Sequence, residues 1–474
     1  MSAIDMERDD EPPARTKMVA SLGPATDAPG MIDAILRGGV DVVRLNFSHG
    51  NHQEHARRLA EVREASSRLG TPVAVLVDLQ GGKIRIGAVG NDGIAHDLEH
   101  GDAFTITTAG WALGPTATTV SHPALADEVA VGDRVLLDDG RLQLRIEQIV
   151  GGELRCRVEI GGRLLAHKGL NVPGRPNTVP SLTDKDVQDA AWLAGREVDL
   201  VALSFVRDAH DVVRVRELLA PATPRLIAKI ERVDALANIE AILAEADGIM
   251  VARGDLGLEI PIENLPVVQK DLVKLALAAG KPVIVATQML ESMTASPLPT
   301  RAEVADVANA ILDGADAVML SGETSIGYRP AAVVRMMNRI ALRTEASRYR
   351  ALRLEPSAGR NGLTAALAAA AATLADHLDG SVLVLDGGDP GLCRLAARWT
   401  TASCLAVCGD AATARRLALT WGVVPVLFDG CDFTTVRARS DLHSSLTSAA
   451  GIKDAARLIF AGRCCGVTLV ELGE

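Results

Sequence analysis

The chain has 474 residues, 48% hydrophobic and 23% charged, a composition typical of a folded protein long enough for several domains. Its formal net charge of -11 argues against a broad basic surface, and hence against nucleic acid or an anionic membrane as a partner. The seven cysteines show no Cys-x-x-Cys spacing, which favours reduced thiols in the cytoplasm over a disulfide framework or a zinc site.

We expect neither a secretory signal at the N-terminus nor a membrane-spanning segment. Residues 1–15 are acidic and lack the apolar core of a secretory signal, so we interpret them as a flexible leader to a cytoplasmic chain. The most apolar stretch, residues 362–378, contains Asp376 and His377 near its end, which suits a packed helix better than a bilayer span. We therefore expect no contact with a membrane.

Eight short runs rich in Val, Ile, Leu or Ala recur along the chain and predict strands. They read KMVASLG, VDVVRLNFSHG, VAVLVDLQGG, VDLVALSF, RLIAKIE, ADGIMVARGD, KPVIVATQ and ADAVMLSGET. Segments with helical spacing lie between most of them, for example residues 28–39. Alternating strands and helices pair in parallel, so eight such units predict an α/β fold, a closed (β/α)8 TIM barrel, at residues 16–86 and 173–343.

Two further regions flank this pattern. Between Asp78 and Pro180 the sequence shows short strand patterns and turn signals without a helix-length pattern. We expect an inserted all-β, barrel-like lid domain at residues 87–172, hanging over the mouth of the barrel. After Arg343 a new alternation begins and predicts a C-terminal α/β domain at residues 344–474.

Charged residues at the ends of two neighbouring strands point to a site. Lys229 and Glu231 share one face of a strand that is otherwise apolar, although an isolated pair of this kind is usually a structural ion pair. The next strand is followed by Asp255 in a glycine-flanked turn. Because the carboxyl ends of barrel strands meet at one face, Glu231 and Asp255 can converge as hard oxygen ligands for magnesium.

Other strand ends carry polar side chains as well. Arg44, Asn46 and Ser48 lie on one face of the second predicted strand, and this combination suits a phosphate site. Thr287 ends the seventh strand, where a hydroxyl bonded to its own backbone is an equal alternative, and for Glu323 we favour a structural role. The chain has neither a P-loop nor a GxGxxG motif, so phosphoryl transfer would have to rely on a metal and a lysine.

Several of these stretches resemble the pyruvate kinase family, and the resemblance covers nearly the whole chain. They are TKMVASLGPATD, VDVVRLNFSHG, HKGLNVPG, IAKIE, GIMVARGDLGLEIP and residues 286–330. The resemblance implies the three-domain fold described above, usually as a homotetramer. It also implies transfer of a phosphoryl group from phosphoenolpyruvate to ADP, giving pyruvate and ATP in the last step of glycolysis, with Mg²⁺ or Mn²⁺.

The same resemblance implies a role for individual residues. The catalytic set would be Lys229, Thr287 and Arg44, with Lys229 stabilising the transferring phosphoryl group. The substrate would meet Arg44, Lys229, Gly254, Asp255 and Thr287, and the magnesium ligands would be Glu231 and Asp255. The nucleotide would contact Asn46, His49, Arg85 and the lid residue Lys168.

The chain departs from the family pattern where many members bind potassium. Those members resemble D-T-K-G-P-E-I-R-T after the third strand, whereas this chain reads DLQGGKIRI, with Lys83 in the place of the glutamate. The expected monovalent-cation region is Asn46, Ser48 and Asp78. A tethered ammonium carries the charge of potassium, so we expect Lys83 to replace the ion and potassium not to be required, as in the potassium-independent bacterial group.

Alternatives to this function remain open at the level of sequence. One is a barrel lyase or aldolase acting on a pyruvate enolate, with Lys229 as a Schiff base. Another is a catalytically silent paralogue that senses metabolites. Allosteric family members bind a sugar bisphosphate in the C-terminal domain through a Ser/Thr-rich loop, but here that loop reads LDGGDPGL, so we expect no such site.

Overall fold

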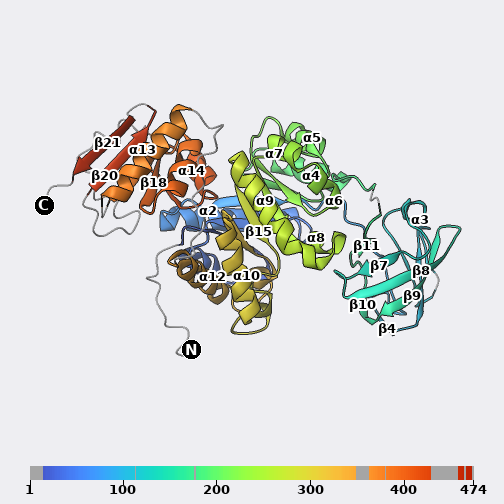
Figure 1. Ribbon diagram of the computed structural model, residues 1–474. Coiled ribbons are helices and arrows are strands. Elements are labelled where there is room, and N and C mark those ends of the chain that lie inside the picture. Colours follow the sequence, from blue (N-terminus) through green and yellow to red (C-terminus); the bar gives the residue numbers. More distant parts are fainter. Residues whose placement is uncertain are drawn as a thin grey trace.

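The computed structural model describes residues 14–112, 114–175, 178–347, 362–378, 381–428, 457–463 and 466–471 (Figure 1). Most of the expected leader and the pair Cys464 and Cys465 lie outside these residues. Arg15, expected within the leader, donates from Nη2 to the carbonyl of Ala397 at 2.8 Å and lies over the ring of Trp421.

Eight parallel strands form a closed barrel, as predicted, with one strand from each of the eight apolar runs. They are β1 (Lys17–Ser21), β2 (Val42–Asn46), β3 (Ala74–Asp78), β12 (Leu200–Leu203), β13 (Arg225–Ile230), β14 (Gly248–Ala252), β15 (Val283–Ala286) and β16 (Ala317–Leu320). Each strand is buried because it has barrel interior on one side and helices on the other.

Helices surround the barrel and connect its strands (Figure 1). They are α1 (Met31–Arg37), α2 (His52–Leu69), α4 (Asp184–Leu193), α5 (Ala209–Leu219), α6 (Val233–Ala237), α7 (Ile239–Glu245), α8 (Arg253–Glu259), α9 (Leu265–Ala279), α10 (Arg301–Asp313), α11 (Gly322–Ser325) and α12 (Pro330–Glu345). The 3₁₀ turns in the barrel are η2 (Pro24–Thr26), η3 (Ile262–Asn264) and η4 (Glu291–Thr294).

Alternation along the strands separates two apolar layers. In β13, Ile227 belongs to the core inside the barrel, whereas Ala228 and Ile230 belong to the core between barrel and helices. Side chains on a strand alternate between its two faces, so Lys229 must follow Ile227 into the barrel. The strand therefore delivers its charge to the interior at the carboxyl end.

The amino-terminal end of the barrel is closed by four equivalent aspartates. They directly precede every second strand, at positions Asp41, Asp199, Asp247 and Asp316. Each one donates its backbone N–H to a residue of the preceding strand and accepts that residue's N–H through its carboxylate, at 2.8–3.1 Å. Each reciprocal pair satisfies backbone groups that the start of the ladder would leave unpaired.

The lid follows β3 and lies to one side of the barrel (Figure 1). Its main sheet has the order β11-β7-β8-β9-β5-β6, and β10 and β4 form a separate pair. The strands are β4 (Ala95–Leu98), β5 (Ala103–Thr107), β6 (Ala117–Thr119), β7 (Arg134–Leu137), β8 (Leu142–Val150), β9 (Glu153–Ile160), β10 (Gly162–Leu165) and β11 (Leu170–Asn171), with one helix, α3 (Leu125–Glu128). The lid has its own apolar core, centred on residues such as Phe104 and Leu137.

The C-terminal domain is an α/β sheet on the side of the barrel away from the lid (Figure 1). Its strands have the order β19-β18-β17-β20-β21, with β21 antiparallel to β20. They are β17 (Ser381–Asp386), β18 (Ser403–Cys408), β19 (Val423–Leu427), β20 (Arg457–Gly462) and β21 (Gly466–Glu471), with α13 (Leu363–His377), α14 (Pro390–Trp399) and α15 (Ala411–Leu417).

The contact between this domain and the barrel is apolar and ionic. Ala418 and Leu419 pack into the core inside the barrel, and Arg394 and Arg398 pair with the buried carboxylate of Asp316.

No helix among the described residues is long and apolar enough to cross a membrane.

Candidate active site

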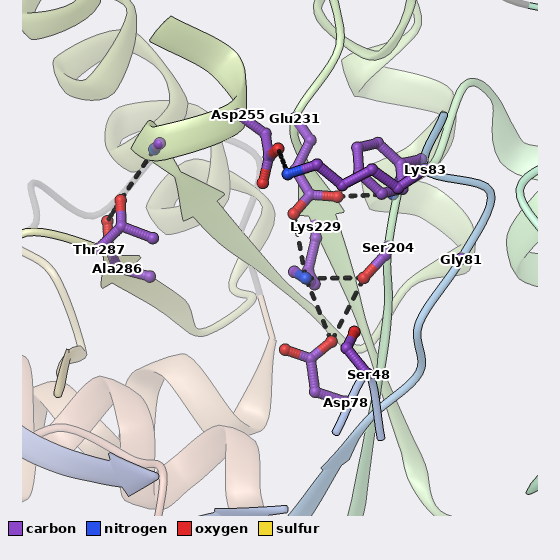
Figure 2. Close-up of polar contacts among 12 residues, drawn as sticks. Ser48, Asp78, Gly81, Lys83, Ser204, Lys229, Glu231, Asp255, Ala286 and Thr287 are labelled. Carbon is purple, nitrogen blue, oxygen red and sulfur yellow. Dashed lines mark hydrogen bonds and ion pairs between the residues drawn. The ribbon is translucent and has the colours of Figure 1, made fainter. Parts of the chain in front are cut away.

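Lys229 lies at the carboxyl end of β13 inside the barrel, where its ammonium is surrounded by oxygen atoms (Figure 2). Its Nζ is 3.2 Å from Oδ1 of Asp78, 2.7 Å from Oγ of Ser204 and 3.0 Å from Oε1 of Glu231. Burial lowers the pKa of Lys229, but the charges of Asp78 and Glu231 outweigh it, so the pKa is raised. The side chain is therefore a fixed positive charge at neutral pH.

Arg44 shares Asp78 with Lys229. Its Nε donates to Oδ2 of Asp78 at 2.7 Å, and its Nη1 donates to Oγ of Ser21 at 2.8 Å. Burial raises the pKa of Asp78, but the two cations outweigh this effect and keep it below its usual value. One ionised carboxylate thus holds an arginine and a lysine together, and this pair of cations suits a phosphoryl group.

Glu231 and Asp255 provide the carboxylates expected to hold a divalent metal. Glu231 accepts the backbone N–H of Phe205 through Oε2 at 2.7 Å, and burial, with a contribution from Asp255, raises its pKa despite the opposing charge of Lys229. Asp255 lies in the first turn of α8, which begins directly after β14, rather than in the expected turn. Oδ1 of Asp255 accepts from Nζ of Lys83 at 2.8 Å.

These two carboxylates fit a hard divalent cation. Both offer carboxylate oxygens, Glu231 directly after β13 and Asp255 from the first turn of α8. The raised pKa of Glu231 reflects its burial and the negative charge of Asp255, which a bound cation would offset. Within the described residues, no three His, Cys, Asp or Glu side chains form a metal-binding group by themselves. A pair of carboxylates is typical of Mg²⁺, which usually keeps several waters and binds substrate phosphates.

Thr287 and Gly254 meet at the end of β15. Oγ1 of Thr287 accepts the N–H of Gly254 at 2.8 Å and donates to the carbonyl of Ala286 at 2.7 Å. The hydroxyl therefore bonds to the backbone next to it, and it also contacts Gly254, a residue expected to bind substrate. Thr287 has a left-handed backbone, with φ of 71°, and the following Gln288 also has a positive φ. Strained non-glycine residues of this kind cluster at functional sites.

The expected nucleotide contacts are spread between barrel and lid. Lys168 pairs with Asp138 at 2.7 Å, and Arg85 donates to the carbonyl of His167 at 3.0 Å, both within the lid or its connection. On the barrel side, burial and the charge of Arg85 lower the pKa of His49. The effect of Arg85 on His49 connects the two sides of this set.

The expected monovalent-cation region is partly filled by protein groups. Both oxygens of Asp78 bind cationic side chains, and Oδ1 of Asn46 accepts the N–H of Ser48 at 3.1 Å. Among contacts between described residues, Lys83 pairs with Asp255 and Asp139 rather than with this region. Replacement of potassium by Lys83 therefore stays a prediction.

Two residues of the site were missed by reasoning from sequence. Ser204 contacts Lys229 and also donates to the carbonyl of Leu79 at 2.7 Å, and Phe205, with a positive φ of 55°, turns its N–H toward Glu231. The run VDLVALSF did carry a signal, because alternation puts Ser204 on the same face as Ala202 inside the barrel. Glu323 has the expected structural role, accepting the N–H groups of Leu290 and Ser321.

A barrel with cations and carboxylates gathered at the carboxyl ends of its strands is the architecture of a (β/α)8-barrel enzyme, and the charges suit phosphoryl transfer.

Residues 13–334 match the model of the family described as "Pyruvate kinase, barrel domain". "Pyruvate kinase 2" of Synechocystis is 42% identical over 420 residues, covering 88% of this chain and 71% of that protein. "Pyruvate kinase" of Geobacillus stearothermophilus is 43% identical, covering 86% and 71%. "Pyruvate kinase" of Mycobacterium intracellulare is 43% identical, covering 87% and 88%. The chain belongs to the pyruvate kinase family and is a phosphotransferase.

Proposed function

We propose that the chain transfers the phosphoryl group of phosphoenolpyruvate to ADP, producing pyruvate and ATP. The observation that carries the proposal is the position of Lys229, a permanently charged ammonium beside the paired carboxylates Glu231 and Asp255 at the mouth of the barrel. Phosphoryl transfer requires little covalent work from a protein, so fixed cations and positioning supply most of the catalysis. The likeness to three named pyruvate kinases supports the same reaction.

In this proposal Arg44 binds the phosphate of the substrate and Lys229 stabilises the charge that develops on the transferring group. Glu231 and Asp255 hold Mg²⁺ or Mn²⁺. When bound, that metal supplies Lewis-acid stabilisation of the phosphoryl oxygens. Asp78 keeps both side-chain cations in place through its two oxygens.

The remaining roles concern the two ends of the substrates. Gly254 and Asp255, at the start of α8, would meet the substrate carboxylate, as the resemblance to the family implies. Thr287 would lie near the enolate carbon. The nucleotide contacts would be Asn46, His49, Arg85 and Lys168, with the lid excluding water from the transfer.

Other properties belong to the same proposal. We expect a cytoplasmic homotetramer with domains at the boundaries given above, and we expect potassium not to be required. The last expectation is supported by Asp78, whose two carboxylate oxygens already bind the cationic side chains of Arg44 and Lys229.

The lyase or aldolase alternative is not favoured by the electrostatics of the site. A Schiff base needs a neutral amine, but the charges of Asp78 and Glu231 raise the pKa of Lys229 above its usual value. The ammonium would therefore have to lose its proton against two nearby carboxylates. This cost disfavours Lys229 as a nucleophile.

A coupled assay of pyruvate formation tests the proposed reaction. The purified chain would be supplied with phosphoenolpyruvate, Mg²⁺ and ADP, with other diphosphates in parallel. Pyruvate formation that requires both ADP and the metal supports phosphoryl transfer. Pyruvate formation without ADP, or trapping of substrate on Lys229 by borohydride, would favour the lyase; no turnover under any condition would favour a silent paralogue.

A further inference from the structure

Lys83 contacts a proposed metal ligand directly. Its Nζ lies 2.8 Å from Oδ1 of Asp255 and 3.4 Å from Oδ1 of Asp139 (Figure 2 shows the first contact). Burial lowers the pKa of Lys83, but the charges of Asp255 and Asp139 outweigh it and raise the pKa. The side chain is 18% exposed, so this ion pair is only partly screened by water.

The backbone around Lys83 lies where the lid joins the barrel. Ile86 donates its N–H to the carbonyl of Lys168, and Leu170 donates to that of Ile84, so the two connecting segments are paired beside Lys83. A Cβ added to Gly169 would lie 2.6 Å from Cε of Lys83, which shows that the lysine stem packs closely on the returning segment. The ammonium is therefore directed toward Asp255 by its packing.

We propose that the ammonium of Lys83 occupies the position of the divalent cation at Asp255 in the metal-free enzyme, and that the metal must displace it. The inference rests on the proposed assignment of Glu231 and Asp255 as metal ligands. The competition between Lys83 and the metal concerns the metal-free enzyme, whereas replacement of potassium by Lys83 concerns the enzyme with its metal and substrates bound. The two proposals therefore assign Lys83 to different states.

Charge balance supports the exchange. Two carboxylates at neighbouring strand ends repel each other, and a tethered cation reduces this repulsion when no metal is bound. Nζ of Lys83 lies 2.8 Å from Oδ1 of Asp255, and a metal ion bound to that oxygen from the same side would need the same space. The lysine therefore competes with the metal. Its presence should lower the affinity of the free enzyme for divalent cations.

The second contact of Lys83 connects this exchange to the lid. Asp139 lies in the turn between β7 and β8, where Asp138 and Asp139 both have a positive φ. A Cβ added to the next residue, Gly140, would lie 3.1 Å from Cδ2 of Leu258, so the tip of this turn touches α8. Lys83 thus connects Asp139 of the lid with Asp255 of α8. When the metal displaces Lys83 from Asp255, this connection is lost.

Manganese binding to the enzyme without substrates tests the competition. Free Mn²⁺ would be followed by electron paramagnetic resonance for the parent, Lys83→Met and Lys274→Met. Lys274 is exposed on α9 and provides a control with the same change in net charge. We expect Lys83→Met to bind Mn²⁺ about tenfold more tightly, because a directly bonded competing charge is lost, and Lys274→Met to match the parent.

A third variant separates this inference from the proposed function. If Asp255→Asn leaves Mn²⁺ affinity unchanged, the ligand assignment itself fails. If Asp255→Asn weakens binding but Lys83→Met binds Mn²⁺ no more tightly than the parent, only the competition is refuted.

Chemical labelling of the unmodified enzyme gives a readout that needs no variant to fold. Trace acetylation followed by mass spectrometry would compare the amine of Lys83 with and without saturating Mn²⁺. We expect labelling of Lys83 to become several-fold faster when the metal is bound, while Lys274 is unaffected. An unchanged or slower rate at Lys83 would overturn the inference.

Discussion

At the scale of single residues, strand alternation was enough to place Lys229 and Arg44 inside the barrel. It could not identify their partners. Asp78 and Ser204 are 151 and 25 residues away from Lys229 along the chain, and only closure of the barrel brings the three together. The direction of a side chain is a local property, but a network of charges is a property of the assembled strands.

Lys229→Met should leave binding of phosphoenolpyruvate largely intact and lower kcat by about three orders of magnitude. The reason is that the ammonium acts mainly in the transition state, when charge develops on the transferring group. Steady-state kinetics of pyruvate formation would measure both quantities. Near-native kcat, or a change confined to KM, would contradict the role assigned to Lys229.

Glu231→Gln and Asp255→Asn should each weaken metal activation by about 10- to 100-fold, because each removes a charged oxygen ligand from a hard cation. The measurement is the Mg²⁺ concentration that gives half-maximal activity. Glu259→Gln serves as a control, since Glu259 lies at the far end of α8, the helix that carries Asp255, and accepts a hydrogen bond from Asn171 of the lid. Unchanged metal dependence in both ligand variants would refute the assignment.

Activity in sodium or tetramethylammonium buffer should be close to activity in potassium, because the tethered ammonium of Lys83 carries the charge that potassium would bring to the loaded enzyme. Lys83→Glu should create a requirement for potassium. Rates in the three buffers at constant ionic strength provide the test. Strong potassium activation of the unmodified enzyme would show that Lys83 does not replace the ion.

At the scale of elements, backbone strain is gathered around the mouth of the barrel. The described non-glycine residues with positive φ are Asp138, Asp139, His167, Phe205, Thr287 and Gln288. They come from the turn between β7 and β8, from the lid connection and from two barrel strand ends. Local propensity disfavours such conformations, so sequence patterns could not locate them, and the surrounding fold must stabilise them.

The loop between β17 and α14 explains why a sugar bisphosphate should not activate this enzyme. Asp389 accepts the N–H of Leu392 at 3.0 Å and the Nε–H of Arg463 at 2.7 Å. Its carboxylate therefore already bonds to the start of α14, and it pairs with an arginine that could otherwise bind a phosphate. We expect fructose 1,6-bisphosphate to leave the phosphoenolpyruvate saturation curve unchanged. A clear leftward shift of that curve would contradict the expectation.

At the scale of the whole molecule, the order of the apolar runs predicted the barrel, the lid insertion and the C-terminal α/β domain. Strands β17, β18 and β19 belong to the alternation predicted after Arg343, but β20 and β21 were not anticipated. The residues between those two strands contain no Asn-Gly or Asp-Gly signal for a hairpin. Packing between domains was also beyond sequence patterns, because it depends on side chains such as Arg394 meeting Asp316.

Asp316 should make the stability of the molecule depend on acid pH. Burial raises the pKa of Asp316, but Arg394 and Arg398 outweigh it, so the folded pKa is lowered. A lowered folded pKa adds stability that is complete above the unfolded pKa of about 3.9 and is lost as the pH falls through the folded value. At neutral pH, Asp316→Asn should therefore cost on the order of 3 kcal/mol, because two buried arginines lose their counter-charge.

Thermal unfolding of the parent and of Asp316→Asn between pH 7 and pH 3 would measure this effect. The difference in Tm should be largest at neutral pH and should shrink below pH about 4, where Asp316 of the unfolded parent begins to bind a proton while the folded carboxylate is still ionised. Asp33→Asn is the control, since Asp33 forms a surface pair with Arg68 and should change Tm little. A difference in Tm that does not vary with pH would show that the charge of Asp316 is not responsible.

The four aspartates at the base of the barrel bear on how such a barrel can grow by gene duplication. Each aspartate closes one pair of consecutive strands through its own backbone N–H and one carboxylate oxygen. A copied segment of two strands would therefore carry its own closure and join the next copy in register. Duplication by one strand would leave backbone groups at the base unpaired, a cost that burial makes severe. The spacing of these aspartates marks the boundaries of a two-stranded unit from which the barrel can be assembled in tandem.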